Sequence, residues 1–310
     1  MRPPRVLAVG LSCLDHLWRV ERFPPTLSRT PASAYSSQGG GPAATAAVTV
    51  ARLGGRAALW AVHGDDASGR AALAELEACG VDCAGVREVP GATSFVSAVL
   101  VAPGGERYIF PYYGPSLDDD PASWDLGELA ELDCLLFDAR HPRLAQAAAR
   151  EARRRGVPVV ADFSNTRNWH LAPGADYLIV SAECAAEVLG RGEPEAALMR
   201  LKQRDDQLVG ITLGEQGFLY HDPGLGETRH IPAFHVEAVD TTGAGDVFHG
   251  AYAYGVARGW TPSRCGLFAS VTAALKCTAL GGRAGIPGLA EVETLLLEKT
   301  AREMDGRTWK

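Results

Sequence analysis

Short apolar runs recur along the chain, and each has the length and the Val, Ile and Leu content of a buried strand. Between many of them lie stretches with the periodicity of a helix. The predicted strands are residues 6–9, 94–101, 134–137, 157–161, 177–180 and 208–212. The predicted helices between them are residues 43–53, 68–79, 144–155, 182–189 and 195–202. This alternation is typical of an α/β fold with a mostly parallel sheet covered on both faces.

The carboxyl-terminal third has a different pattern, with longer helical stretches at 246–258, 262–280 and 289–303. A strand-like run at 234–239 leads into the first of them through a glycine-rich turn. We expect a nucleotide to bind in this part of the chain.

Two segments do not fit the strand–helix alternation. Residues 17–37 are interrupted by Pro and Ser, and residues 93–113 alternate apolar and polar positions around a Pro-Gly-Gly turn at 103–105. We predict that they form a small separate sheet that acts as a lid.

Composition narrows the class of protein. The net charge of -7 leaves no basic surface for a nucleic-acid backbone, and the basic run at 150–155 is interpreted as a solvated helix face. No apolar stretch reaches the roughly 18 residues of a membrane span. The seven cysteines lack CxxC or Cys/His zinc spacing. We therefore expect a cytoplasmic protein with reduced thiols that binds neither nucleic acid nor membrane.

The candidate chemistry lies at residues 240–246, Asp-Thr-Thr-Gly-Ala-Gly-Asp. A glycine turn that opens a helix is an anion site, because unpaired amide groups and the positive end of the helix dipole converge there. Gly243, Ala244 and Gly245 would form this site. Asp246, in the first helical turn, could accept the proton of a substrate hydroxyl during phosphoryl transfer.

A purely structural reading of these residues is also open. Asp246 could be only a helix cap, and the glycines only a tight turn. The chain has neither a GxxxxGK[ST] P-loop nor a His-Arg-Asp catalytic loop, and its first strand is not followed by GxGxxG. The common kinase and dinucleotide designs are therefore absent.

Several separated motifs, taken together, resemble the ribokinase-like or PfkB family of carbohydrate kinases over nearly the whole chain. They are Val9-Gly10 with Asp15 and Pro24, 39–46 (GGGPAATA) with 52–54 (RLG), 64–66 (GDD) with Gly69, Gly80-Val81, 212–214 (TLG) with Gly217, and 240–246. The resemblance implies a single domain over 1–310 with a three-layer α/β/α architecture. It implies a small β-sheet lid from about 15–38 and 93–113, and a nucleotide-binding part over about 176–303.

The same resemblance assigns roles to residues. It implies that Asp246 is the base, that 243–245 form the anion hole, and that Asp15, Gly40 and Gly41 hold sugar hydroxyls. Ser181, Thr212, Gly214, Gly217 and Gly282 would lie beside the nucleotide. ATP with Mg²⁺ would be the phosphate donor. Ser181 and Cys184 stand where the family shows an Asn-x-x-Glu pair, which leaves the surroundings of the magnesium ion altered.

Asp240 and Thr242, with carbonyls near 281–285, match positions where many relatives hold a potassium ion. The alternative for Asp240 is that it ends a strand and caps the glycine turn.

Longer matches at 39–47, 240–250, 273–278 and 281–287 resemble the bacterial branch that contains sulfofructose kinase, which phosphorylates a ketose. Thr45 replaces the sugar-contacting Asn of most relatives, and Pro111 replaces a polar residue. Arg140 matches a position where a guanidinium could clamp an acid group. A sulfofructose-like or fructose-like ketose is the leading prediction, and ribose or a nucleoside is the alternative.

Two further expectations concern the whole protein. The family suggests a homodimer in which the two lids pack together. From a different class, the chain could be a sugar or nucleotide sensor that binds its ligands without consuming ATP.

Overall fold

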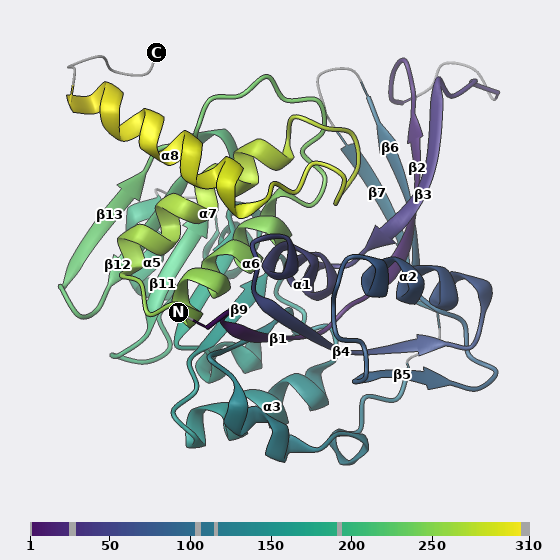
Figure 1. The fold of residues 1–310 in the computed structure, drawn as a ribbon, viewed down its shortest axis with the longest axis horizontal. Helices are drawn as coiled ribbons and strands as arrows, with labels where there is room; N and C mark the ends of the chain where they lie inside the picture. The colour runs from purple at the N-terminus through teal and green to yellow at the C-terminus, as the bar shows by residue number, and fades with distance from the viewer. Residues whose placement is uncertain (1, 25–28, 103–106, 115–116, 191–193, 305–310) are drawn as a thin grey trace.

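The computed structural model describes residues 2–24, 29–102, 107–114, 117–190 and 194–304. A nine-stranded sheet runs through the centre of the molecule in the order β13-β12-β11-β10-β9-β8-β1-β4-β5 (Figure 1). Its strands are β1 Arg5–Val9, β4 Arg56–Gly64, β5 Val86–Val89, β8 Cys134–Phe137, β9 Val159–Phe163, β10 Tyr177–Ser181, β11 Leu208–Thr212, β12 Phe218–Asp222 and β13 Glu227–Ile231. Every neighbouring pair is parallel except the two that include β12.

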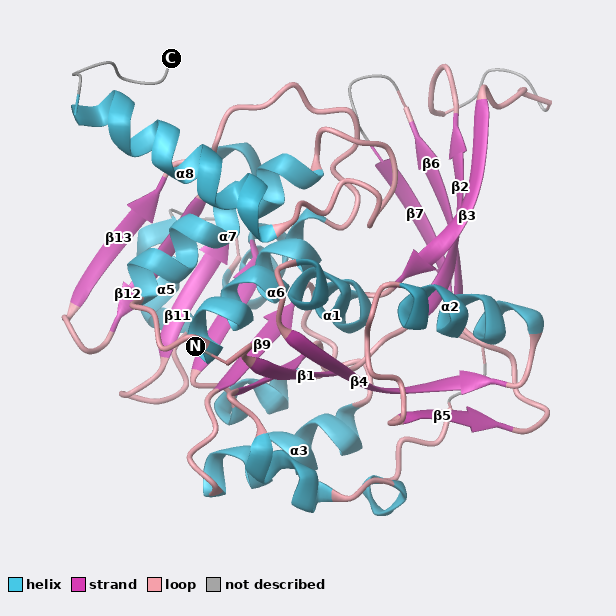
Figure 2. Cartoon of the chain, viewed as in Figure 1, coloured by secondary structure: helices cyan, strands magenta, loops and turns pink. Residues whose placement is uncertain are grey.

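Helices cover both faces of this sheet (Figure 2). On one face lie α1 Pro42–Arg52, α2 Ala67–Ala78, α6 Ala244–Ala257, α7 Pro262–Lys276 and α8 Leu289–Met304. On the other lie α3 Pro142–Arg154, α4 Ala182–Leu189 and α5 Pro194–Leu201. Alternate residues of β1 enter the two cores, because successive side chains of a strand point to opposite faces. The mostly parallel α/β architecture predicted from the sequence is confirmed.

A second, four-stranded sheet stands at one side of the molecule in the order β3-β2-β6-β7 (Figure 1). Its strands are β2 Cys13–Arg19, β3 Ala34–Gly40, β6 Val96–Val101 and β7 Arg107–Tyr112. The β6 and β7 strands pair antiparallel, as a hairpin requires. The turn expected at 103–105 lies outside the described residues. The two segments that did not fit the α/β alternation therefore supply the strands of this small sheet.

Two expectations about the elements are wrong. Residues 234–239 form no strand, because the amides of Val239 and Asp240 both donate to the carbonyl of Cys277 at the end of α7. The helix expected over 262–280 ends at Lys276, and residues 277–282 continue as turns.

Among the described residues, no helix is both long and apolar enough to cross a membrane. All seven cysteines are free thiols.

Candidate functional site

A cleft of about 350 Å³ opens between the small sheet and the carboxyl ends of the central strands. Open α/β sheets bind their ligands at this edge. The cleft brings together most of the residues that the sequence singled out, although they are spread over more than 260 positions. They are Asp15, Gly40, Gly41, Thr45, Arg140, Ser181, Thr212, Thr242, Gly243, Gly245, Asp246 and Gly282.

The remaining predicted residues do not line the cleft. Gly214 and Gly217 form the turn between β11 and β12, where a side chain on Gly217 would meet the Ile231 carbonyl at 2.1 Å. Ala244 begins α6, and Asp240 is fully buried behind the glycine turn. The left-handed φ of 59° at Gly214 and the close approach at Gly217 favour glycine at both positions, whether or not a nucleotide binds there.

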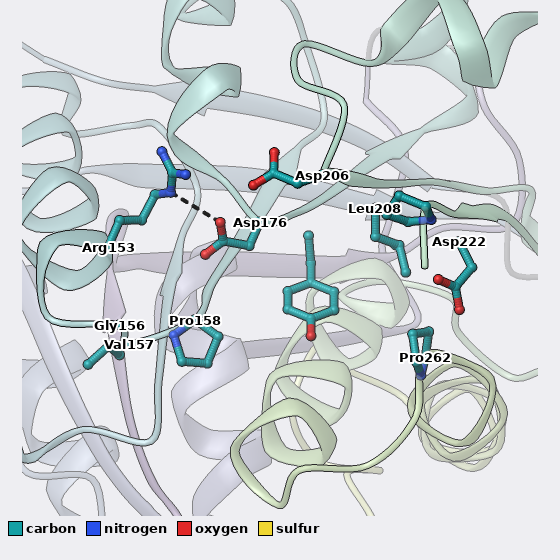
Figure 3. A pocket seen from close by; sticks show the side chains of 11 residues that line it. Arg153, Gly156, Val157, Pro158, Asp176, Asp206, Leu208, Asp222 and Pro262 are labelled. Atoms are coloured by element: carbon teal, nitrogen blue, oxygen red, sulfur yellow. Dashed lines mark hydrogen bonds and ion pairs between the residues drawn. The ribbon is translucent and has the colours of Figure 1, made fainter. Parts of the chain in front are cut away.

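A second cavity, of about 370 Å³, lies by the amino ends of β10 and β11 (Figure 3). Its wall includes Asp206, Asp222 and the Arg153–Asp176 ion pair, whose atoms lie 3.1 Å apart. Among the described residues that line it, three carboxylates accompany a single arginine, and no glycine turn opens a helix there. This excess of negative charge opposes the binding of phosphates. The cleft beside the small sheet is therefore the better candidate for nucleotide chemistry.

The glycine turn enters α6 through Gly243, whose φ of 75° is left-handed. A side chain there would lie 2.8 Å from the Gly282 carbonyl, so both conformation and space require glycine. The amides of Gly245 and Asp246 donate no hydrogen bond within the described part of the chain. These amides, at the amino end of a 14-residue helix, can receive an anion.

Asp240 fixes the shape of this turn. Its two carboxylate oxygens accept hydrogen bonds from the amides of Thr242 and Gly281, each at 2.8 Å. Burial alone would raise the pKa of Asp240, but these hydrogen bonds hold it below its ordinary value. The ionised carboxylate therefore joins the two loops that face each other across the anion site.

Asp246 and Asp162 are two of the carboxylates that line the cleft. Burial raises the pKa of Asp246 to about 7, and the charge of Asp162 adds to that shift. Burial likewise raises the pKa of Asp162 to about 7, with Asp138 adding and Arg140 opposing. A carboxylate whose pKa lies near neutrality is suited to accept a proton and release it again.

His249 lies beneath these carboxylates, on the first turns of α6. Its Nδ1 is 2.7 Å from the Gly245 carbonyl oxygen and 3.3 Å from Asp162 Oδ2, while Nε2 is 3.3 Å from the Ile179 carbonyl oxygen. The short contact indicates that Nδ1–H donates to Gly245. Burial lowers the pKa of His249, although both carbonyls and Asp246 oppose that shift. The ring therefore links the glycine turn to β9 and β10.

The opposite wall of the cleft is built from the base of the small sheet. Asp15 on β2 lies against Gly40 on β3, where a side chain would meet Asp15 Oδ2 at 2.0 Å. Cys13 donates its thiol hydrogen to Asp15, and Ser97 lines the same wall. Burial raises the pKa of Asp15. These groups can accept and donate the several hydrogen bonds that a polyol offers.

Arg283 joins this wall to the core. Its guanidinium donates to the Gly40 carbonyl at 2.7 Å, to Thr45 Oγ1 at 3.2 Å and to Glu75 Oε1 at 3.2 Å. The Arg283 side chain is 5% exposed and that of Glu75 is 31% exposed. Because Thr45 Oγ1 accepts from Arg283, its own hydrogen remains free to point into the cleft, which Thr45 lines.

Two more arginines face the cleft. Arg140 donates to the Tyr113 hydroxyl at 3.0 Å and to Ser164 Oγ at 3.3 Å, and its guanidinium carbon lies 5.5 Å from the centre of the Tyr113 ring. Among the described residues no carboxylate forms an ion pair with it. Arg107, on β7, donates to the Thr241 hydroxyl and so connects the small sheet with the glycine turn.

The sequence reading missed Asp162, His249, Arg283 and Arg107. A signal existed for Asp162, since it sits at the carboxyl end of a predicted parallel strand, where ligands bind. His249 and Arg283 fall within the longer motif matches, but those matches gave them no role. The side chains that His249, Arg283 and Arg107 contact are far away in the sequence.

Comparisons with known proteins place the chain among sugar kinases. A profile of the pfkB family carbohydrate kinases matches residues 4–288. The ATP-dependent ribose-1-phosphate kinase of Halopiger xanaduensis is 34% identical over 254 residues, which cover 79% of this chain and 82% of that protein. The ribokinase of Lactococcus lactis is 26% identical over 306 residues, covering 95% and 97%.

Solved structures agree with this family at the level of the whole fold. The crystal structure of a provisionally assigned ribokinase from Agrobacterium tumefaciens superposes with a TM-score of 0.92 at 33% identity, covering 97% of this chain and 100% of that one. The ribokinase-like fold predicted from the sequence is confirmed.

Proposed function

Since this chain belongs to the pfkB family of carbohydrate kinases and is an ATP-dependent sugar kinase, we propose that its substrate is a monosaccharide with an anionic group. The observation that carries this proposal is Arg140, a guanidinium in the cleft whose hydrogen-bond partners are the neutral Tyr113 and Ser164. A planar guanidinium suits phosphate or sulfonate oxygens. The leading candidate is a sulfofructose-like ketose, and a sugar phosphate satisfies the same chemistry.

In the proposed reaction Asp246 takes the proton of the attacking hydroxyl as its oxygen bonds to the γ-phosphorus. The bond from that phosphorus to the β-phosphate oxygen breaks, and ADP leaves. The amides of Gly245 and Asp246 face the transferring group, and Arg107 adds positive charge. Asp15, the Gly40 region and Thr45 hold the sugar. Asp246 and the glycine turn both line the cleft, as a kinase reaction would need, so we do not propose the non-catalytic sensor.

Magnesium would accompany the nucleotide. Glu183 and Asp162 line the cleft beside the glycine turn and are hard oxygen donors of the kind Mg²⁺ binds, directly or through water. When bound, the ion would neutralise the negative charges of neighbouring phosphate groups of ATP. Among the described residues there is no group of three or more His, Cys, Asp or Glu side chains that could hold a metal ion.

A substrate panel tests the anionic-sugar proposal. With Mg²⁺-ATP we expect higher kcat/KM for sulfofructose, ribose 1-phosphate, tagatose 6-phosphate, fructose 1-phosphate or 2-keto-3-deoxygluconate than for fructose, ribose and adenosine. Arg140→Met should lower kcat/KM for the acidic substrate on the order of 100-fold, the value of a charge-assisted hydrogen bond or two, and leave neutral sugars within about threefold.

The matched control is Arg143→Met, because Arg143 is paired with Asp118 and Asp120 outside the cleft. A neutral sugar as best substrate, with no effect of Arg140→Met, would keep the kinase and discard the acid clamp. It would favour the fructose, ribose or nucleoside alternative.

We also propose that the small sheet acts as a lid and pairs with the lid of a second copy. Its outer face presents Trp18, Tyr35, Phe110 and Tyr112, of which Phe110 is 53% and Tyr112 is 56% exposed. An exposed aromatic patch of this kind marks an interaction surface.

A cytoplasmic location stays a prediction from the sequence.

Light scattering tests the pairing of lids. We expect twice the chain mass for the wild type and the single chain mass for Phe110→Lys, because a buried charge in the aromatic face costs more than the contact gains. Leu225→Lys, at an exposed position between β12 and β13, should remain dimeric. A monomeric wild type at working concentration would exclude the lid dimer.

A further inference from the structure

Lys276, the last residue of α7, carries a buried charge close to the anion site. Its side chain is 0% exposed, and Nζ donates to the backbone carbonyl of Asp240 at 2.8 Å. Burial lowers the pKa of the Lys276 amine and Arg107 adds to that shift, while the carboxylates of Asp240 and Asp246 oppose it. Lysine is almost never fully buried unless it is paired. A fully buried lysine behind a glycine turn therefore calls for a functional explanation.

The position of Lys276 bears on the potassium site that family resemblance suggests at Asp240, Thr242 and carbonyls near 281–285. Both carboxylate oxygens of Asp240 already accept amide hydrogen bonds, from Thr242 and Gly281. The Asp240 carbonyl accepts from Lys276. The loop that would supply further carbonyls folds directly on Lys276, since a side chain on Gly285 would meet the Lys276 carbonyl at 2.3 Å.

A potassium ion bound there would have to share these oxygens with an ammonium group. Two cations in one buried place repel each other strongly, because little water screens them. The residues present therefore do not fit the added ion.

We propose that the ammonium of Lys276 is the resident cation of this site and stands in for a monovalent metal ion. It is a compact single charge with three donors, which is the group best able to replace an alkali ion among carbonyl oxygens. From behind the turn it holds Asp240, whose carboxylate orders the amides of Thr242 and Gly281. It also adds fixed positive charge behind the position of the transferring phosphate.

The inference rests on the proposed nucleotide site, and its test needs no sugar. Wild-type protein in tetramethylammonium buffer should bind Mg²⁺-ATP with the same Kd, within twofold, with or without 100 mM KCl. Its Tm should likewise not respond to potassium beyond the shift caused by tetramethylammonium chloride of equal ionic strength. Once the sugar substrate is known, the kcat of the wild type should likewise be the same with and without potassium.

Lys276→Ala opens the space for an ion. We expect its ATP Kd to rise at least tenfold without potassium, and both Kd and Tm to recover toward wild type when KCl is added. Lys202→Met, at the carboxyl end of α5, is the matched control and should behave as wild type. Failure to find a sugar would count against the proposed function alone.

Three results would overturn the inference. The first is a rise of tenfold or more in the ATP affinity or kcat of the wild-type protein when potassium is added. This can be measured even if no variant folds. The second is an ATP Kd and a Tm of Lys276→Ala that equal those of the wild type in the absence of potassium. The third is a folded Lys276→Ala variant whose Tm and ATP Kd do not change when potassium is added, which would leave Lys276 with a packing role only.

Discussion

Asp246→Asn is expected to lower kcat by on the order of 10²–10⁴-fold, because a positioned base contributes that much to a proton transfer. Asparagine has the size of aspartate but cannot accept the proton. The KM for ATP should stay within about threefold, since the amides of the glycine turn are unchanged. Asp118→Asn, at an exposed position, is the matched control.

The pH dependence gives a second readout of the same variant. The pKa of Asp246 is raised to about 7, so the base is largely protonated at pH 6 and ionised at pH 8. We expect wild-type kcat/KM to rise with pH across this range and then level off. The rise belongs to the Asp246–Asp162 pair, because both groups titrate there. In Asp246→Asn the contribution of Asp246 to the rise of kcat/KM with pH should be missing.

The contribution of Asp246 to the stability of the fold should fall as the pH rises, whereas kcat/KM increases. A carboxyl group whose folded pKa lies above its unfolded value stabilises the fold at low pH, and that contribution is lost as pH rises through the folded pKa. The Tm of Asp246→Asn should therefore match or exceed that of the wild type at pH 8. Turnover near the wild-type level in a folded Asp246→Asn would remove Asp246 from its role as base.

Arg283→Met is expected to have the second largest effect, on both stability and sugar binding. Removing one partner of a buried ion pair typically costs 3–5 kcal/mol. Glu75 is partly exposed and keeps the Gly39 amide as a donor, so we expect about 2–3 kcal/mol here. The KM for the sugar should rise about tenfold, the value of one net hydrogen bond, because Thr45 and Gly40 lose their common donor.

A double variant separates the two effects. Glu75→Gln with Arg283→Met removes the unpaired carboxylate and should recover part of the stability, measured by urea unfolding, while the sugar KM stays high. Arg52→Met is the matched control, since Arg52 donates to the Ile286 carbonyl of the same loop from outside the cleft. If the KM for the sugar is unchanged in Arg283→Met, Arg283 stabilises the fold but does not contribute to sugar binding.

The sequence by itself determined the features that depend on neighbouring residues. The period of the apolar residues predicted the strands and helices of a parallel sheet, because each buried face must be apolar. The glycine turn and Asp246 could be found because an anion site at a helix start needs contiguous residues. The misfit of 17–37 and 93–113 with this pattern indicated a second sheet.

The local pattern failed where a distant segment decides the conformation. Residues 234–239 have the composition of a strand, but their last amides pair with the end of α7 and not with another strand. No window of sequence contains that contact.

The tertiary structure alone decided the electrostatics of the site. Arg283 meets Thr45 and Glu75 from more than 200 residues away, and Lys276 reaches Asp240 across 36 residues. Asp162 comes from β9 to lie beside His249 on α6. Charge interactions depend on distance in space and on burial, neither of which a linear pattern records. The sequence therefore identified a candidate base and a candidate anion site, and only the fold showed which charges surround them.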